Sequence, residues 1–429
     1  MTDRMIKLDG YMPVRVDGRM GLCQHLSLER LLVDMPKGSK LNGEQGLTLV
    51  CSDSLSVSAR ARVVGVDGVR FEMEVLEFLG AGRERLVGHI SSLRKSAHLN
   101  IVAKNDVEAA NTRAGWHRWR LPHEALPELD ADAVSLQTTF LGKTLAAPLV
   151  IAGMTGGSAR AGIVNLRLAR MAQELGLGMG LGSQRAMIEA PELASTFQVR
   201  EVAPDILLIG NIGAVQLNYG VGTDDVRRLL DSVQADALAI HLNVLQEMVQ
   251  PEGDRNWAGL ARKMEALIEA VDVPVIVKET GCGIQAGTAL QLRDLGAAAI
   301  DVGGTGGTSW GWIEGFRAAD PQRQAIGATF RDWGIPTAES LMSVRDAVGP
   351  EFPLMSTGGV RTGLDVAKAV ALGADVAGMA LPFFLAADVS DDEVVALGKR
   401  IVEEVRIAMV CSGCEDVAAL GMVGPVEVR

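Results

Sequence analysis

Eight short apolar runs, spread over residues 149–379, constrain the fold of this chain more than any other feature of its sequence. Each run ends in glycine or polar residues, and most are followed by segments with apolar residues three or four positions apart, such as 224–234 and 257–271. This alternation is typical of βα units, and eight strands favour a closed (β/α)8 TIM barrel, of class α/β, over an open doubly wound sheet. The runs are residues 149–153, 178–182, 206–210, 237–241, 275–278, 299–302, 354–357 and 376–379.

The first ninety residues follow a different pattern. Residues 47–52, 55–66 and 69–78 alternate as antiparallel strands do, and Asp67-Gly68 is typical of a hairpin turn. A helix is predicted over residues 84–92, and the pattern resembles a truncated hotdog-like thioesterase fold. We therefore divide the 429 residues into an accessory, β-rich α+β extension domain of unknown role, 1–92, and the barrel, 93–429.

Charge and composition exclude several kinds of partner. The formal net charge of -12 argues against nucleic acid or an anionic membrane, because a basic surface holds either of these. The longest apolar stretch, 371–389, is interrupted by Asp375, Pro382 and Asp388, so no membrane span is predicted. The five scattered cysteines favour reduced thiols and, with no signal pattern at the N-terminus, a cytoplasmic location.

Polar side chains gather at the end of the fourth apolar run and directly after it. His241, Asn243, Gln246 and Glu247 fall within seven residues, at the carboxyl end of a strand, which in an α/β barrel is the active face. Glu247 suits Mg²⁺, which takes one or two protein carboxylates and fills its other positions with water and phosphate oxygens. Taken singly, His241 could be a core histidine and Glu247 a carboxylate at a helix N-terminus. Together they predict a site.

Glycine-rich stretches end five of the proposed strands, at residues 154–157, 182–185, 210–213, 303–307 and 358–361. The loops after strands seven and eight, with a helix N-terminus, commonly form a phosphate site in such barrels, so a phosphorylated cofactor or substrate is predicted. Lys278 ends the fifth strand, where it could face a flavin, neutralise a phosphate or simply lie at the surface. Arg94, Lys95 and His98 could hold a diphosphate or form a solvated helix face.

Together these motifs resemble those of type 2 isopentenyl-diphosphate Δ-isomerases, flavin-dependent enzymes that interconvert isopentenyl and dimethylallyl diphosphates. The resemblance runs from Arg94 to about Leu420. Its motifs are Arg94-Lys95-x-x-His98, His123-x-Ala125-Leu126-Pro127-Glu128, Met154-Thr155-Gly156-Gly157, Gly182-Ser183-Gln184-Arg185, Asn211-Ile212-Gly213-Ala214, His241-Leu242-Asn243 through Gln246-Glu247, Gln250-Pro251-Glu252-Gly253, Lys278-Glu279-x-Gly281, Gly306-Gly307-Thr308-Ser309, Trp333-Gly334-Ile335-Pro336-Thr337 and Ser356-Thr357-Gly358-Gly359-Val360-Arg361.

This resemblance implies a role for each matching residue. It makes Glu247 the Mg²⁺ ligand and gives catalytic roles to His241, Gln246 and Lys278. The residues implied to bind the substrate are Arg94, Lys95, His98, Arg185, His241 and Gln246. The residues implied to line FMN are Met154, Thr155, Gly156, Ser183, Asn211, Lys278, Thr308, Gly358, Gly359, Arg361, Ala380 and Leu381.

The implied reaction moves a proton across an allylic system, with reduced FMN as the acid and base, NADPH as its reductant and no net redox change. The resemblance also implies a homo-oligomer and a small-molecule diphosphate substrate. This sequence departs from the family in three places. About ninety residues precede the Arg94-Lys95 motif, which opens the chain in the family; Ala97 takes a position that is often acidic; and Gly303-Gly304-Thr305 precedes the matching Gly306-Gly307-Thr308 triplet.

Three other readings stay open. A flavin-dependent 2-hydroxy-acid oxidase needs a histidine base late in the barrel, and none of the six histidines lies beyond His241. A nucleotide dehydrogenase that uses a thiolate would need Cys282 as its nucleophile, although such enzymes usually place that cysteine after a later strand. A non-catalytic flavin or phosphate sensor, regulated by the N-terminal domain, conflicts with the density of polar residues at the strand ends.

Overall fold

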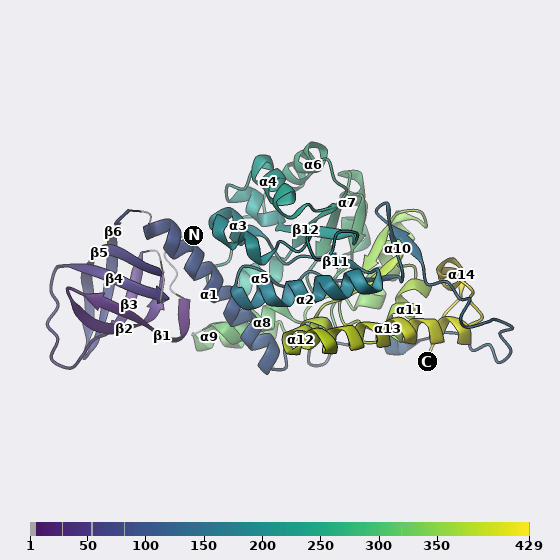
Figure 1. Ribbon diagram of the computed structural model, residues 1–429, viewed down its shortest axis with the longest axis horizontal. Coiled ribbons are helices and arrows are strands. Elements are labelled where there is room, and N and C mark those ends of the chain that lie inside the picture. The colour runs from purple at the N-terminus through teal and green to yellow at the C-terminus, as the bar shows by residue number, and fades with distance from the viewer. Residues whose placement is uncertain (1–5, 28, 53–54, 81, 319, 429) are drawn as a thin grey trace.

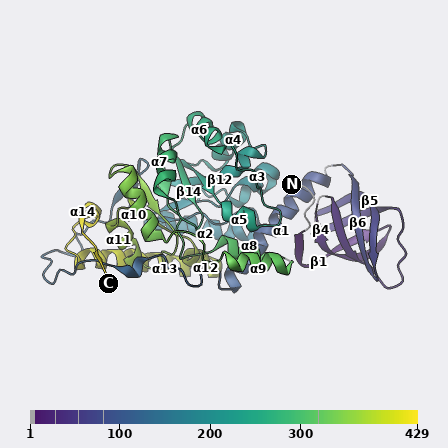
Figure 2. The same ribbon diagram turned by 180° about the vertical axis from the view of Figure 1, so that it is seen from behind.

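Two barrels, connected by one long helix, make up the protein (Figure 1). The computed structural model describes residues 6–27, 29–52, 55–80, 82–318 and 320–428. The helix is α1 (Gly82–Lys104), and it begins beside the smaller barrel and ends beside the larger one. The view from behind shows the same separation of the two barrels (Figure 2).

The N-terminal barrel is a closed, antiparallel sheet with the strand order β1-β2-β3-β6-β5-β4. Buried residues alternate with exposed ones along its strands, as with Val14 and Val16 in the first strand, so apolar side chains fill the interior. The strands are β1 (Ile6–Val16), β2 (Arg19–Leu26), β3 (Arg30–Asp34), β4 (Glu44–Ser52), β5 (Leu55–Asp67) and β6 (Arg70–Phe78).

Three of these strands, β4 to β6, and the turn at Asp67-Gly68 confirm the sequence prediction. The hotdog-like expectation is wrong, because β4 pairs with β1 through Val14 and Leu49 and so closes the sheet into a barrel. The predicted helix over residues 84–92 is the first part of α1, which continues to Lys104. The proposed domain boundary at residue 92 therefore falls inside a continuous helix.

The larger barrel is a closed sheet of eight parallel strands, which confirms the predicted (β/α)8 fold. All eight predicted runs are strands, in chain order around the barrel, and β10 closes it by pairing with β17. The strands are β10 (Leu149–Ile151), β11 (Gly178–Gly180), β12 (Leu208–Gly213), β13 (Ala237–Leu242), β14 (Val275–Glu279), β15 (Ala299–Asp301), β16 (Leu354–Ser356) and β17 (Val376–Met379).

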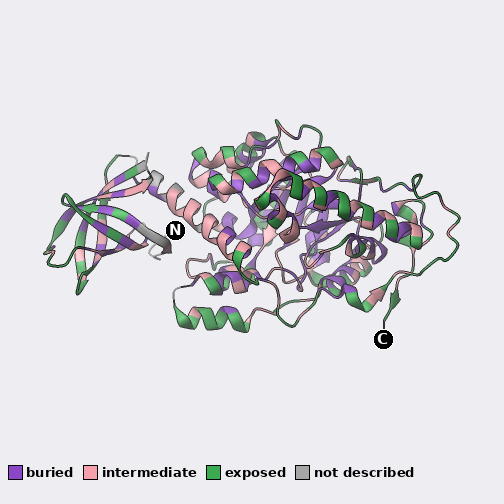
Figure 3. Ribbon diagram, turned by 60° about the horizontal axis from the view of Figure 1, so that its bottom comes forward, coloured by how far each residue is buried: buried purple, intermediate pink, exposed green. Residues whose placement is uncertain are grey.

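Helices surround this sheet, and burial decreases from the strands outward (Figure 3). The predicted closing segment over residues 391–410 is the single helix α13. The helices after α1 are α2 (Ala159–Leu175), α3 (Arg185–Glu189), α4 (Thr223–Val233), α5 (Val244–Val249), α6 (Leu260–Ala270), α7 (Ala286–Asp294), α8 (Trp310–Arg317), α9 (Pro321–Thr329), α10 (Thr337–Val348), α11 (Gly363–Ala371), α12 (Leu381–Val389), α13 (Asp391–Cys411) and α14 (Val417–Met422).

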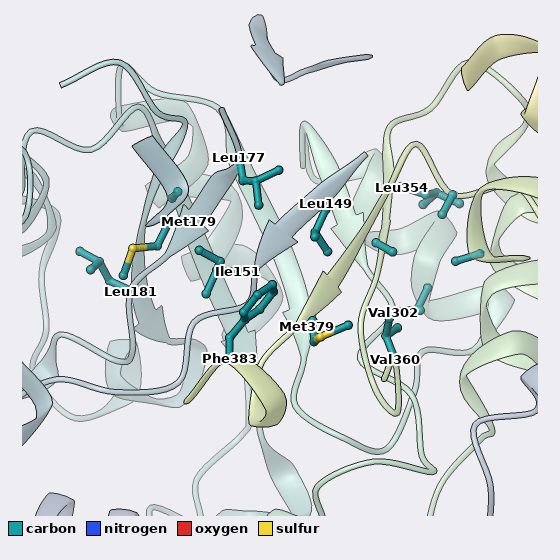
Figure 4. Close-up of a cluster of buried hydrophobic side chains, with 14 of the residues drawn as sticks. Leu149, Ile151, Leu177, Met179, Leu181, Val302, Leu354, Val360, Met379 and Phe383 are labelled. Atoms are coloured by element: carbon teal, nitrogen blue, oxygen red, sulfur yellow. The ribbon is translucent and has the colours of Figure 1, made fainter. Parts of the chain in front are cut away.

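Alternate residues of each barrel strand face different parts of the core. Leu149 and Ile151 of β10 pack with Met379 and Phe383 between the sheet and the helices (Figure 4), whereas Val150 belongs to the cluster inside the barrel. A hairpin of β8 (Thr138–Phe140) and β9 (Lys143–Leu145) adds buried side chains to that inner cluster. Polar residues occupy the carboxyl ends of the strands, at the end of the barrel opposite this hairpin.

Shorter elements complete the chain. They are the 3-10 helices η1 (Trp116–Arg118), η2 (Pro191–Thr196) and η3 (Ala214–Asn218), and a small sheet of β7 (Trp119–Arg120) with β18 (Val426–Glu427). Among the helices that the structure describes, none is apolar over the length that a lipid bilayer requires.

Candidate active site

One cavity at the carboxyl ends of the barrel strands brings together almost all of the predicted site residues. The predicted residues that line it are Lys95, His98, Met154, Thr155, Ser183, Arg185, Asn211, His241, Gln246, Glu247, Lys278, Thr308, Gly358, Gly359, Arg361, Ala380 and Leu381. Gly156 is not among the lining residues, and a Cβ atom on it would fall 1.8 Å from the ring of Phe197. The side chain of Arg94 lies outside the described residues.

His241, at the end of β13, is fixed by a neighbouring strand. Its Nδ1 lies 2.8 Å from Oδ1 of Asn211, whose amide nitrogen donates to the Leu181 carbonyl. With the Asn211 oxygen facing the ring, Nδ1 carries the proton and Nε2 is an acceptor. Burial, and then the charges of Lys278 and Lys95, lower the pKa of His241 to about 3, so the imidazole is neutral at physiological pH.

The lowered pKa of His241 predicts acid sensitivity. Between pH 6.5 and about 3 the unfolded chain binds a proton at this residue and the folded chain does not, so the free energy of unfolding falls as the pH drops through this window. Burial raises the pKa of Glu279 from 4.5 to about 7, which acts in the opposite sense over pH 4.5–7. We expect His241→Gln to lose less stability than the unmodified protein between pH 6.5 and pH 4 in urea unfolding. Equal losses would contradict the assignment.

Glu247, in the first turn of α5, belongs to a rigid frame of charged groups. Its Oε1 accepts a hydrogen bond from the side chain of Asn243 (2.9 Å), and its Oε2 accepts one from the backbone of Asp254 (2.7 Å). The carboxylate of Asp254 in turn accepts from Nη1 of Arg185 at 2.6 Å, and Nε of Arg185 donates to Glu189. Hydrogen bonds through Asp254 thus connect the cation of Arg185 with the carboxylate of Glu247.

Gln246 and His98 meet at a buried carboxylate that the sequence analysis did not single out. Glu314 of α8 accepts from Nε2 of Gln246 at 3.0 Å, and its Oε1 lies 2.9 Å from Nε2 of His98. Burial opposes ionisation of Glu314, but the charges of Arg317 and His98 outweigh it and lower the pKa of this carboxyl. Glu314 therefore stays anionic, and it holds both an amide and an imidazole at the cavity wall.

Lys278, at the end of β14, stands over a second buried carboxylate. Its Nζ donates to the Glu279 carbonyl (2.6 Å) and lies 3.8 Å from Oδ2 of Asp301. The other oxygen of Asp301 accepts from the backbone and hydroxyl of Thr357 and from the backbone of Gly303. Burial raises the pKa of Asp301, and the nearby charge of Lys278 opposes that shift, so the lysine is the partner that favours the ionised carboxylate.

The loops after β16 and β17 have the features of an anion site. Gly358 and Gly359 adopt left-handed φ values of 104° and 69°, and a Cβ on either would meet the backbone of Gly304 or Gly306 within 2.5 Å. Helix α12 begins at Leu381 without a side-chain cap, so backbone N–H groups of its first turn remain for an anion. Arg361 is paired here with Glu108, across 2.7 Å from Nε.

Three carboxylates of this site, Asp301, Glu314 and Glu108, were missed by the sequence analysis. Asp301 ends an apolar run at a strand end, which is a signal of the kind that identified Lys278. Glu314 and Glu108 carry no comparable signal, because a helix and a loop far apart in the sequence bring them against the lining residues Gln246, His98 and Arg361.

Known proteins place this chain in a class that matches the geometry. A family model described as FMN-dependent dehydrogenase matches residues 92–199 and 224–423. A solved mandelate oxidase with (S)-mandelic acid is 20% identical, with a TM-score of 0.56 over 80% of this chain and 98% of that one, and shows the same fold. A solved mandelate oxidase with benzoyl-formic acid is 22% identical to this chain, with a TM-score of 0.55. The class is that of the FMN-dependent barrel enzymes.

Curated relatives narrow the class to one family. An isopentenyl-diphosphate delta-isomerase from a Nostoc species is 47% identical over 334 residues, which are 78% of this chain and 95% of that protein. Those of a Synechococcus species and of Stutzerimonas stutzeri are 50% and 48% identical, over 76% of this chain and 94% of each relative. The chain belongs to the isopentenyl-diphosphate delta-isomerases, in their type 2, FMN-dependent form.

Two of the rival readings lose support from the geometry. Cys282 does not line the cavity, its backbone N–H donates to Glu279, and burial and then the charge of Glu279 raise the pKa of its thiol. Such a thiol is no activated nucleophile. The histidines at the cavity are His98 and His241, so the described residues offer no late histidine base of the kind that a 2-hydroxy-acid oxidase requires.

Proposed function

We propose that this chain isomerises isopentenyl diphosphate to dimethylallyl diphosphate in isoprenoid biosynthesis, on reduced FMN and with Mg²⁺. The observation that carries the proposal is the convergence of the described cations, the strand-end amides, Glu247 and the glycine loops on one cavity. Isopentenyl-diphosphate delta-isomerase is also the name of curated relatives that are 45–50% identical.

The residues present fit FMN. The left-handed glycines at 358 and 359 and the uncapped start of α12 suit its phosphate, and Lys278, held between Asp301 and the Glu279 carbonyl, suits the electron-rich edge of its ring. Met154, Thr155, Ser183, Asn211 and Thr308 would line the remainder. When bound and reduced, FMN would supply a proton donor and acceptor next to the weakly basic alkene.

The residues also fit a single magnesium ion that binds with the substrate. No cluster of three or more metal-ligating side chains occurs among the described residues, so Glu247 would be the protein carboxylate and the diphosphate oxygens and water would complete the shell. The hydrogen bonds from Asn243 and from the backbone of Asp254 hold this carboxylate at the cavity wall. Glu247 would hold the ion, and the ion would supply positive charge to the diphosphate.

Different residues of the chain would bind the diphosphate and contact the allylic part of the substrate. Lys95, His98 and Arg185 would bind the diphosphate, and the link from Arg185 through Asp254 to Glu247 would hold it in one place. Gln246 would lie near the allylic carbons, with its amide fixed by Glu314, while neutral His241 offers Nε2 as an acceptor to the substrate. The reaction adds one proton to the substrate and removes another, so the substrate is neither oxidised nor reduced.

The test is an anaerobic assay of the purified protein with FMN, NADPH and Mg²⁺. We expect dimethylallyl diphosphate from isopentenyl diphosphate, and no product without the flavin. A yellow protein that makes no dimethylallyl diphosphate would refute the activity, and a colourless protein that takes up no FMN would favour the sensor reading. Cys282→Ala is the matched control and should keep full activity. NADPH as the reductant, a homo-oligomeric state and a cytoplasmic location stay proposals.

A further inference from the structure

The N-terminal barrel and the cavity share one helix. We propose that the N-terminal barrel holds the first half of α1 and so positions Lys95 for the substrate diphosphate, with Leu86 as the positioning residue. The inference rests on the proposed function only in so far as Lys95 binds the diphosphate. It gives the extension domain a role in substrate binding.

The first half of α1 is built into the N-terminal barrel. The side chain of Leu86 is fully buried in the same apolar cluster as Leu31, Val57 and Phe71, and Ile90 packs against that cluster one turn later. At the start of the helix, a Cβ on Gly82 would lie 3.2 Å from the Ser58 carbonyl of β5. The helix therefore begins in close contact with the small barrel.

The second half of α1 belongs to the larger barrel. Leu99 and Val102 are buried in its core, and Nε2 of His98 lies 2.9 Å from Glu314. Asn100 accepts a hydrogen bond from Arg160 at 2.7 Å. These contacts hold the helix from His98 onward, and Lys95, one turn earlier, lines the cavity close to Gly157.

Helix termini explain why that position depends on the first half. The first four N–H groups of a helix have no acceptor within it, and short helices fray in water. Because α1 begins at Gly82, the N–H of Lys95 lies deep within the helix and has the carbonyl of residue 91 as its acceptor. If the helix were released from the small barrel, Lys95 would fall in a fraying first turn, while His98 to Val102 would keep their own contacts.

Among the residues that the structure describes, α1 is the main contact between the two barrels. Among the element pairs of the described chain that pack extensively, α1 is the element that reaches both, against β5 and β1 at one end and against α8, α3 and α2 at the other. Both views show the helix between the two barrels (Figures 1 and 2). The matching family model begins at residue 92, so the small barrel is additional to the part of the chain that defines the family.

The direct test interrupts the helix and leaves both barrels whole. Two glycines inserted between Ser92 and Leu93 of the full chain should raise the KM for isopentenyl diphosphate about tenfold, with kcat within about twofold, because Lys95 binds substrate and transition state alike. Amide hydrogen exchange should accelerate at residues 95–97 and stay unchanged at 99–102. The matched control, two glycines inserted between Gly38 and Ser39 in a turn of the small barrel, should change neither.

A pair of point variants tests the assignment of Leu86. Leu86→Ala and Leu31→Ala each open a hole in the same buried cluster, but the second lies on β3, whose packing against α1 is not extensive. Leu86→Ala should raise KM and the exchange of residues 95–97 more than Leu31→Ala does. Equal effects of the two variants would overturn the role of Leu86.

Unchanged exchange and KM in the insertion variant would overturn the proposal altogether. Neither amide hydrogen exchange nor the calorimetric binding of inorganic pyrophosphate requires turnover. Both measurements can therefore test the proposal even if the unmodified protein lacks isomerase activity. In that case the proposed function fails, while faster exchange of residues 95–97 in Leu86→Ala than in Leu31→Ala would still support the anchoring of α1 by the small barrel.

Discussion

Glu247→Gln is expected to lower kcat about 100-fold and to raise the Mg²⁺ concentration for half-maximal activity, since changes around a metal site cost 10–100-fold and a direct ligand falls at the upper end. An amide offers Mg²⁺ one neutral oxygen in place of an anionic carboxylate. In this structure the two oxygens of Glu247 each accept an N–H, from Asn243 and Asp254, so an amide nitrogen would also face a donor.

The measurement is a Mg²⁺ titration of the initial rate at saturating substrate, for the unmodified protein and for the variant. Glu265→Gln on the exposed side of α6 removes the same charge away from the cavity and should leave the titration unchanged. Superimposable curves for Glu247→Gln and the unmodified protein would refute the metal assignment.

Lys278→Met should lower kcat by about 10²–10³-fold, the range seen when one preorganised electrostatic contact is removed from an active site. Methionine keeps an unbranched apolar chain of similar length and deletes only the ammonium group, which contacts the Glu279 carbonyl and Asp301. We expect weaker binding of FMN as well, measured by titrating the apoprotein and following the visible spectrum.

A double variant separates catalysis from stability at this residue. Removing Lys278 alone leaves Asp301 buried without its counterion, and breaking such a pair costs about 3–5 kcal/mol in the free energy of unfolding. Lys278→Met with Asp301→Asn removes both charges, so it should recover most of that stability and none of the activity. Recovery of activity in the double variant would show that the lysine acts only as a structural partner.

Much of the fold was accessible from local patterns. Each of the eight predicted runs is a barrel strand. A buried strand can be predicted from its own few apolar residues and from the glycine or polar residue that ends it. The strand-end residues His241, Gln246, Glu247 and Lys278 line one cavity for the same reason, since parallel strands direct their carboxyl ends to one face.

Closure and pairing required the tertiary structure. The N-terminal strands were foreseen in part, but pairing of Val14 with Leu49 turns them into a barrel rather than a hotdog-like sheet. Arg185 pairs with Asp254, which is 69 positions away in the sequence, and Arg361 pairs with Glu108, which is 253 positions away. No periodicity in the sequence records such partners, because their encounter depends on how the whole chain folds.

Local patterns of hydrophobicity and glycine, which act within a few residues, were enough to predict the eight barrel strands and the residues at their ends, and the resemblance of the motifs to a known family predicted the class. The tertiary structure alone decided that Glu314 joins Gln246 to His98, that Asp301 supports Lys278, and that α1 runs unbroken from the small barrel to the cavity. Charge pairing in a buried site depends on distance in space, and the chain sets that distance only when it is folded.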